Sequence, residues 1–75
     1  MSIVKLMSGE TVNWIQINIL KEISIREFVV GDKTGLAILE TPADAKNNLK
    51  IEVGKGLKIV KPQKVAYNVL TFVSM

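Results

Sequence analysis

The feature that most constrains the fold is a pair of short apolar runs joined by a polar connection near the middle of the chain. Residues 28–31 and 36–39 are rich in β-branched and aliphatic side chains, and Asp32-Lys33-Thr34-Gly35 separates them. Such runs predict strands, and a connection that starts with Asp and ends with Gly predicts a tight turn in which Gly35 adopts a positive φ. Because a short hairpin fixes the register of both strands, the neighbouring elements must pack against it.

A second pattern lies upstream of this hairpin. Isoleucines recur at odd positions between Ile15 and Ile25, with mostly polar residues between them. This period-2 alternation predicts a half-buried strand that begins near Val12. Lys21 interrupts the series, which predicts a bend or bulge near residues 20–22 and a turn within residues 21–24.

Proline, glycine and asparagine predict where the other elements begin and end. Pro42 ends a strand because it cannot donate to a sheet ladder, and Thr41 and Pro42 are suited to start a short helix. The expected elements are an edge strand or loose arm over residues 1–6, a turn at 8–11, strands over 12–20, 25–30, 36–41, 57–67 (bent at Pro62) and 69–73, and one or two helical turns over 41–49. Five strands and one short helix predict an all-β domain whose sheet closes, fully or partly, into a small Greek-key barrel, since closure removes exposed edges.

Length and composition limit the possible functions. A chain of 75 residues has room for one domain, expected over residues 1–75 with its core at about 10–73. No apolar run approaches the ~18 residues of a membrane span, and no basic segment precedes an apolar one at the start, so we expect neither a membrane anchor nor a signal peptide. The absence of Cys agrees with an intracellular location, which would be the nucleus in a eukaryote.

The same composition argues against catalysis. The chain has no His and no Cys, which excludes His-based triads, thiol nucleophiles and thiolate metal sites. Its carboxylates are scattered, and no glycine-rich phosphate motif or metal-ligand spacing is present. We therefore expect a non-enzymatic protein with no metal and no cofactor.

The net charge is uneven along the chain. Residues 1–37 hold four basic and four acidic side chains, whereas residues 38–75 hold six lysines and three carboxylates, which gives the net charge of +3. This asymmetry predicts a basic surface in the second half of the fold, where an anionic ligand would bind. Solubility is the alternative explanation, because lysines also keep small β proteins from pairing edge to edge.

The element order resembles an oligonucleotide/oligosaccharide-binding (OB) fold, and more closely the OB domains of the replication protein A and simple single-stranded-DNA-binding protein group. Three stretches carry the resemblance: Arg26 to Gly35 with its Asp-x-Thr-Gly turn, Ile51 to Ile59 with its paired glycines, and Tyr67 to Phe72. Together they extend over residues 10–73. The chain departs from the family in its short connection between the first two strands and in the absence of an aromatic residue at Glu40-Thr41-Pro42.

The resemblance implies binding of single-stranded nucleic acid by cationic and aromatic side chains. Phe28 and Phe72 share the parity of core residues, which leaves Trp14 and Tyr67 as stacking candidates. The expected nucleic-acid-binding residues are Trp14, Arg26, Lys33, Lys55, Lys58, Lys61, Lys64 and Tyr67. Structural alternatives remain for each: a lid over the barrel for Trp14, surface packing for Tyr67, a cross-strand carboxylate pair for Arg26 and a solvated face for the lysines.

The first functional hypothesis is therefore a module that binds single-stranded DNA or RNA with no strong sequence preference. The second is a protein-interaction OB domain that assembles with a protein partner or with itself. Apolar residues at parities that face outward, among them Val29, Ile38 and Val60, favour this second hypothesis.

Overall fold

Alternating isoleucines build the longest strand of the protein. The computed structural model describes residues 1–42 and 51–72. In β1 (Trp14–Ser24), Ile15, Ile17 and Ile19 are fully buried, whereas the residues between them are exposed. Successive side chains of a strand point to opposite faces, so as far as Ile19 one face of β1 forms part of the core and the other faces solvent, as the sequence predicts. The series was expected to continue to Ile23 and Ile25, but these two side chains are exposed.

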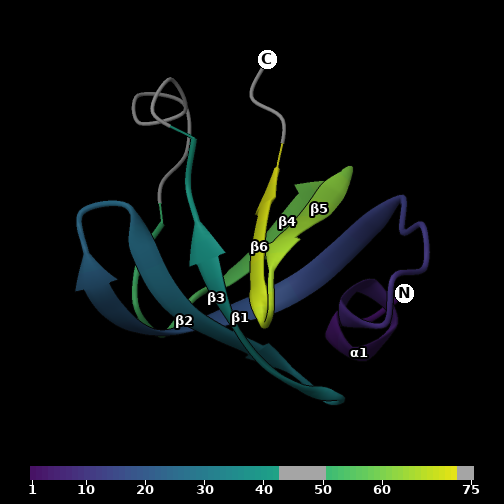
Figure 1. Cartoon of the computed structure of the whole chain (residues 1–75). Coiled ribbons are helices and arrows are strands. Elements are labelled where there is room, and N and C mark those ends of the chain that lie inside the picture. The colour runs from purple at the N-terminus through teal and green to yellow at the C-terminus, as the bar shows by residue number, and fades with distance from the viewer. Residues whose placement is uncertain (43–50, 73–75) are drawn as a thin grey trace.

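The described residues form one curled six-stranded sheet and one short helix. The elements besides β1 are α1 (Ile3–Met7), β2 (Glu27–Asp32), β3 (Gly35–Glu40), β4 (Gly56–Val60), β5 (Pro62–Ala66) and β6 (Val69–Phe72). The strand order is β4-β1-β2-β3-β6-β5, in which β3 and β6 run parallel and the other neighbours run antiparallel. The sheet curls into a half-barrel, and α1 lies beside its lower end (Figure 1). The expected all-β class is confirmed.

The sixth strand arises because the expected fourth strand is split. β4 and β5 occupy the two edges of the sheet, yet only Lys61 separates them in the chain. Lys61 has a φ of 53°, a left-handed conformation that interrupts the extended backbone, and Pro62 has no N–H for the ladder. The predicted bend at Pro62 is thus a complete break, which makes six strands where five were expected.

The first hairpin is longer than expected. The turn falls at residues 25–26 rather than within 21–24, because β1 continues to Ser24. The register with β2 shifts between Ile19 and Lys21 and again between Glu22 and Ser24. The first shift confirms the predicted bulge. These irregularities let the strand continue past Lys21, the residue that suggested its end.

The turn at residues 32–35 is confirmed, although its closure differs from the prediction. Gly35 does not have a positive φ. Instead, the Asp32 carboxylate accepts hydrogen bonds from the Thr34 N–H at 2.7 Å, the Thr34 hydroxyl at 2.6 Å and the Gly35 N–H at 3.2 Å. A side chain that satisfies three donors closes the turn without a left-handed residue.

The N-terminal segment is helical, so the expected edge strand or loose arm is wrong. The Ser2 hydroxyl accepts from the Lys5 N–H at 3.2 Å and caps α1, while Ile3 and Leu6 are buried. The Ile3 N–H donates to the Asp32 carboxylate at 2.9 Å, and the Val4 N–H donates to the Thr34 hydroxyl oxygen at 3.1 Å. The central turn therefore supplies acceptors to the free donors at the start of α1.

The core lies between the inner face of the sheet and α1. Phe28 and Phe72 belong to it, as predicted. Its other buried members are Ile3, Leu6, Val12, Ile15, Ile17, Ile19, Val30, Ala37, Leu39, Ile59 and Leu70. The helix expected over residues 41–49 falls almost entirely outside the described residues, and Thr41 and Pro42 are not helical.

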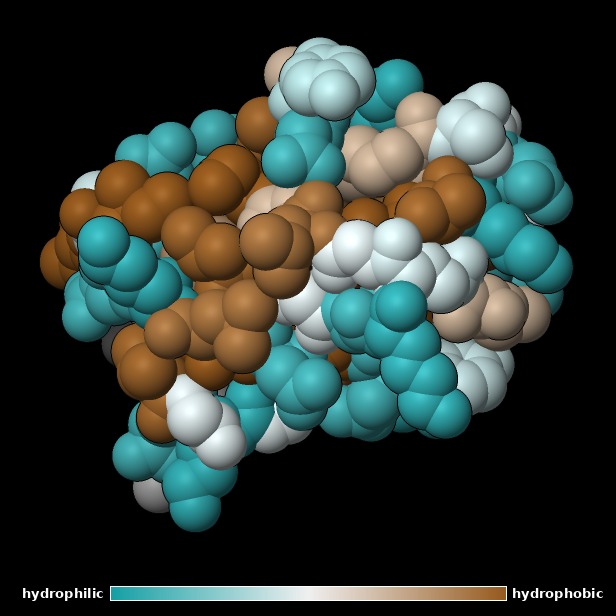
Figure 2. Space-filling view, turned by 90° about the horizontal axis from the view of Figure 1, so that it is seen from below, coloured by the Kyte–Doolittle hydropathy of each residue, from teal (hydrophilic) through white to brown (hydrophobic). Residues whose placement is uncertain are grey.

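The outer surface of the sheet is not uniformly polar. Seen from below, a continuous hydrophobic area crosses much of the molecule, with hydrophilic side chains around it (Figure 2). Leu20 and Leu36, on β1 and β3, are among the large hydrophobic residues that remain exposed, at 48% and 59%.

Candidate nucleic-acid interface

The outer face of the β1–β4 pair brings an aromatic ring, a lysine and two amides together. In the antiparallel register, Trp14 pairs with Val60, Gln16 with Lys58 and Asn18 with Gly56. The buried isoleucines of β1 occupy the alternate positions, so these residues share the solvent side of the sheet. We call this surface the Trp14 face; its members are Trp14, Gln16, Asn18, Gly56, Lys58 and Val60.

Trp14 and Lys58 are in direct contact across the two strands. The Lys58 ammonium nitrogen lies 4.8 Å from the centroid of the Trp14 ring, within the range of a cation–π interaction. The Trp14 side chain remains 42% exposed. The structure thus has an accessible aromatic surface with a positive charge beside it, rather than a tryptophan buried as a lid over the barrel.

Gly56 allows the two amides to lie close to the backbone of β4. A Cβ atom at position 56 would be 2.9 Å from the Gln16 Nε2 atom and 3.7 Å from the Asn18 Oδ1 atom. Because glycine has no side chain, the amides occupy that space. The result is a shallow strip of hydrogen-bond donors and acceptors next to the aromatic ring.

Lysines follow the length of β4. Lys55 comes directly before the strand, and its carbonyl oxygen accepts from the Ile19 N–H at 2.9 Å. Lys61 comes directly after the strand, and its N–H donates to the Asn13 carbonyl at 2.8 Å. At about 3.3 Å per residue, the six steps from residue 55 to residue 61 span about 20 Å. Lys58 belongs to the Trp14 face, and the exposed Lys55 and Lys61 lie at the two ends of β4, at positions that alternate with the outward residues of the strand.

A separate hollow of about 620 Å³ lies beside Lys61. It lies between the loop after α1, the start of β1 and the β4–β5 junction, and its polar lining includes Glu10, Asn13, Gln63 and Lys64. The hollow offers both donors and acceptors, but no member of the Trp14 face lines it.

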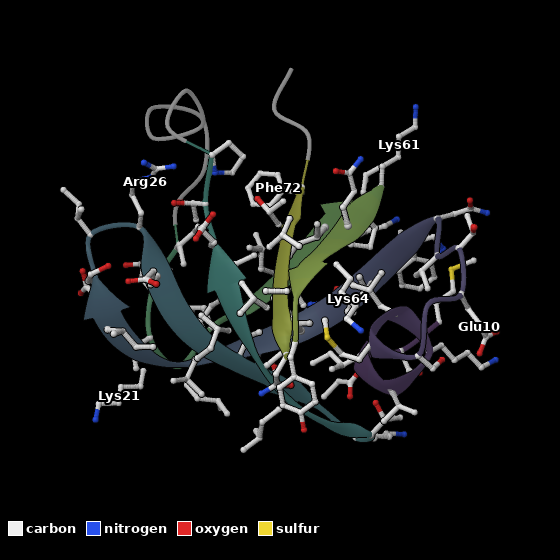
Figure 3. The ribbon with its side chains drawn as sticks, in the orientation of Figure 1. Glu10, Lys21, Arg26, Lys61, Lys64 and Phe72 are labelled. Atoms are coloured by element: carbon white, nitrogen blue, oxygen red, sulfur yellow. The ribbon has the colours of Figure 1, made fainter. Side chains whose placement is uncertain are left out.

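Lys64 is held away from the Trp14 face. It pairs with the buried Leu70, which places its side chain toward the inside of the sheet. Its ammonium group donates to the Met7 carbonyl at 2.9 Å, at the C-terminal end of α1, where a positive charge is favourable. Figure 3 shows Lys64 directed toward α1 and Lys61 directed away from the barrel.

The other three predicted residues are located on separate loops. Arg26, at the β1–β2 turn, donates from Nε to the Thr41 carbonyl at 3.1 Å, and it extends from the side of the barrel opposite Lys61 (Figure 3). Lys33 is at the tip of the β2–β3 turn, and Tyr67, 91% exposed, is at the β5–β6 turn. The structure thus gathers Trp14, Lys55, Lys58 and Lys61 and disperses Arg26, Lys33, Lys64 and Tyr67.

Gln16 and Asn18 are the members of the face that sequence reasoning missed. Their signal was nevertheless present, because they alternate with buried isoleucines and had to point outward. What the sequence could not provide was the register of β4, which places Lys58 opposite Gln16 and next to Trp14.

The described residues contain neither a group of three or more carboxylate, His or Cys side chains that could hold a metal ion, nor a helix with the length and hydrophobicity to cross a membrane. Comparison with protein-family models, with curated proteins and with solved structures gave no match.

Proposed function

We propose that this chain is an OB-fold domain that binds single-stranded nucleic acid on the Trp14 face. The observation that carries the proposal is the exposed Trp14 ring with the Lys58 ammonium 4.8 Å from its centroid, beside the exposed amides of Gln16 and Asn18. Proteins that bind single strands combine aromatic platforms with positive charge, because every base has a π-face and every phosphate a negative charge.

The strand topology supports the OB part of the proposal. The OB fold in general is a partly open Greek-key barrel of five strands. Here β1 pairs with both β2 and β4, and the last strand, β6, runs parallel to β3. β4 and β5 lie at the two edges of the curled sheet. If they are counted as one strand broken at Lys61, the described residues have five strands.

The chemistry of the face assigns a role to each group. One base stacks on Trp14, and Lys58, released from the ring or kept at its edge, neutralises the adjacent phosphate. Lys55 and Lys61 contact phosphates on either side. The amides of Gln16 and Asn18 hydrogen-bond to whichever base edge is presented, since an amide offers both a donor and an acceptor. This arrangement favours binding to DNA or RNA with little sequence preference.

The test is a fluorescence anisotropy titration of the chain with a labelled oligothymidine and with a labelled duplex of the same length, each of about 20 nucleotides. Each titration is repeated at about 50 and 200 mM salt. We expect binding to the single strand that weakens steeply with salt, and weaker binding to the duplex. Absence of single-strand binding at the lower salt concentration contradicts the proposal.

The protein-interaction hypothesis is favoured by a different observation, the hydrophobic area on the neighbouring strands of the same outer surface of the sheet (Figure 2). The two surfaces adjoin, because Asn18 on β1 pairs with Gly31 on β2, but they consist of different side chains.

A further inference from the structure

Three strands next to the Trp14 face, together with the end of β1, present an apolar outer surface. Val29 on β2 pairs with Ile38 on β3, and Ile38 pairs with Val69 on β6, so these three form one row across the sheet. Gly31 pairs with Leu36 in the next row toward the β2–β3 turn. We call this surface the apolar face; its members are Leu20, Val29, Gly31, Leu36, Ile38 and Val69.

The two rows differ in height. A Cβ atom on Gly31 would be 2.8 Å from the Leu36 Cδ2 atom and 3.2 Å from the Leu20 Cδ1 atom, so both leucines fold over the glycine. They are nevertheless about half exposed, whereas Val29, Ile38 and Val69 are partly buried. One row of the apolar face therefore protrudes and the neighbouring row is recessed.

Charges of opposite sign lie beyond the two rows. Glu27 and Glu40 pair directly across β2 and β3 at the end away from the turn. Like charges in such a pair repel each other, so the pair favours the approach of a cation. Lys33, at the tip of the turn, is exposed at the opposite end. The six steps from residue 27 to residue 33 place these charges about 20 Å apart.

We propose that the apolar face binds a second copy of this chain about a two-fold axis, with the two β2–β3 hairpins antiparallel. A two-fold interface requires a surface that is complementary to itself. Turning a copy by half a turn about an axis between the two rows places its leucine row over the Val29–Ile38–Val69 row of the first. The same rotation brings Lys33 of each copy to the Glu27–Glu40 pair of the other.

Both shape and charge thus select the second copy as the occupant. Contiguous exposed apolar side chains surrounded by polar ones are typical of interaction sites. Lys21 pairs with Val29 at the edge of the recessed row and extends away from the barrel in Figure 3, so it borders the interface without entering its centre.

The test is sedimentation of the full chain from about 1 µM to 1 mM, a range that covers weak and moderate association. We expect a monomer–dimer equilibrium. Leu36→Lys places a charge in the centre of the interface and should raise the dimer dissociation constant at least about tenfold. Val65→Lys is the matched control, because Val65 is 51% exposed on β5, outside the apolar face, and the equilibrium should be unchanged.

A charge exchange tests the antiparallel arrangement. Lys33→Glu and Glu40→Lys should each weaken the dimer, because each removes one attraction and places like charges together at both ends. The double variant exchanges the signs of positions 33 and 40, leaves Glu27 unchanged, and should restore part of the association. Recovery supports the arrangement, and failure to recover overturns it.

A monomer at every concentration, or a dimer that Leu36→Lys leaves intact, overturns the whole proposal. Circular dichroism of each variant verifies that the fold is retained, and a variant that fails this control is replaced by Ile38→Lys in the recessed row. The outcome is independent of nucleic-acid binding: oligonucleotide titrations report on the Trp14 face, and sedimentation without nucleic acid reports on the apolar face.

Discussion

The Trp14 face and the apolar face differ in chemistry, although they lie on neighbouring strands of one sheet. On the Trp14 face, the positions between the buried isoleucines hold an indole, two amides and a lysine. On the apolar face, the equivalent outward positions of β2, β3 and β6 hold Val29, Ile38 and Val69. Both faces cover the same core, and their outward side chains do not have to fit into it. The difference in chemistry between the two faces therefore points to different ligands.

Trp14→Ala should produce the largest difference between the two faces, because it should lower oligonucleotide affinity and leave dimerisation unchanged. Loss of one stacked base costs about 1–3 kcal/mol, which lowers oligonucleotide affinity about 5- to 150-fold. Anisotropy titrations measure this loss, and sedimentation should show unchanged dimerisation. Tyr67→Ala provides an aromatic control on a separate turn. An equal loss in both variants would mean that the strand does not follow β1 and β4.

Replacing Asp32 should lower the stability of the β2–β3 hairpin, which carries part of the apolar face. Its carboxylate closes the β2–β3 turn and accepts from the first N–H of α1, so Asp32→Ala should cost about 0.5–2 kcal/mol of the free energy of unfolding, as loss of a helix cap does. Urea denaturation measures this change. Stability equal to that of the unmodified chain would contradict the role of this turn as the anchor of α1.

The same carboxylate predicts a pH dependence. Partial burial raises the pKa of Asp32, but hydrogen bonds from the Thr34 hydroxyl and from the N–H groups of Ile3, Thr34 and Gly35 outweigh it and bring the pKa below its ordinary value of 3.8. A pKa that is lower in the folded state means that this contribution to stability is complete above pH 3.8 and declines as the pH falls through the lowered value. Asp32→Asn should flatten this part of the acid denaturation curve.

A pair of glycine substitutions should separate the two faces by a smaller amount. At Gly31, an alanine Cβ would displace the Leu36 and Leu20 side chains, and we expect a cost of about 1 kcal/mol with weaker dimerisation. At Gly56, the alanine Cβ would meet only the mobile end of Gln16 at 2.9 Å, and the lower flexibility of the unfolded chain offsets the contact. Thermal melts should therefore show Gly31→Ala as the less stable variant; the reverse order would contradict this account.

Lysine substitutions should have the smallest effects, visible mainly in the salt dependence. Lys58→Gln should reduce the slope of log affinity against log salt by about 0.7, the value for one phosphate contact with a single strand. Lys64→Gln is the control, since the Lys64 ammonium is bound to the Met7 carbonyl. Equal slopes for both variants would remove Lys58 from the interface.

Local patterns predicted much of the sheet, and long-range pairing explains what they missed. The alternation around Ile17 and the polar turn at Asp32 reflect neighbouring residues, so both could be read directly. The helix α1 was missed because the N–H groups of Ile3 and Val4 donate to Asp32 and Thr34, some thirty positions away, and its buried side chains pack against the distant core. A segment of five residues has little helical stability of its own.

The candidate site shows the same limit. Trp14 and Lys58 were both selected from the sequence, but their contact depends on the pairing of β1 with β4, across 44 positions. The break at Lys61 was also only partly predicted, because a lysine gives no sign that it adopts a left-handed conformation. The residues that form a face were therefore predictable individually, and their juxtaposition was not.

The one-residue connection between β4 and β5 has a consequence for the order of folding. The β1–β2–β3 meander and the β5–β6 hairpin join segments that are close in sequence, whereas β4 must find β1 and β6 must find β3 across much longer loops. Because such loops cost entropy before their contacts form, the hairpins should assemble early and the junction at Lys61 should be drawn into place last. The Trp14 face depends on the pairing of β1 with β4. It would therefore be completed only in the last step of folding.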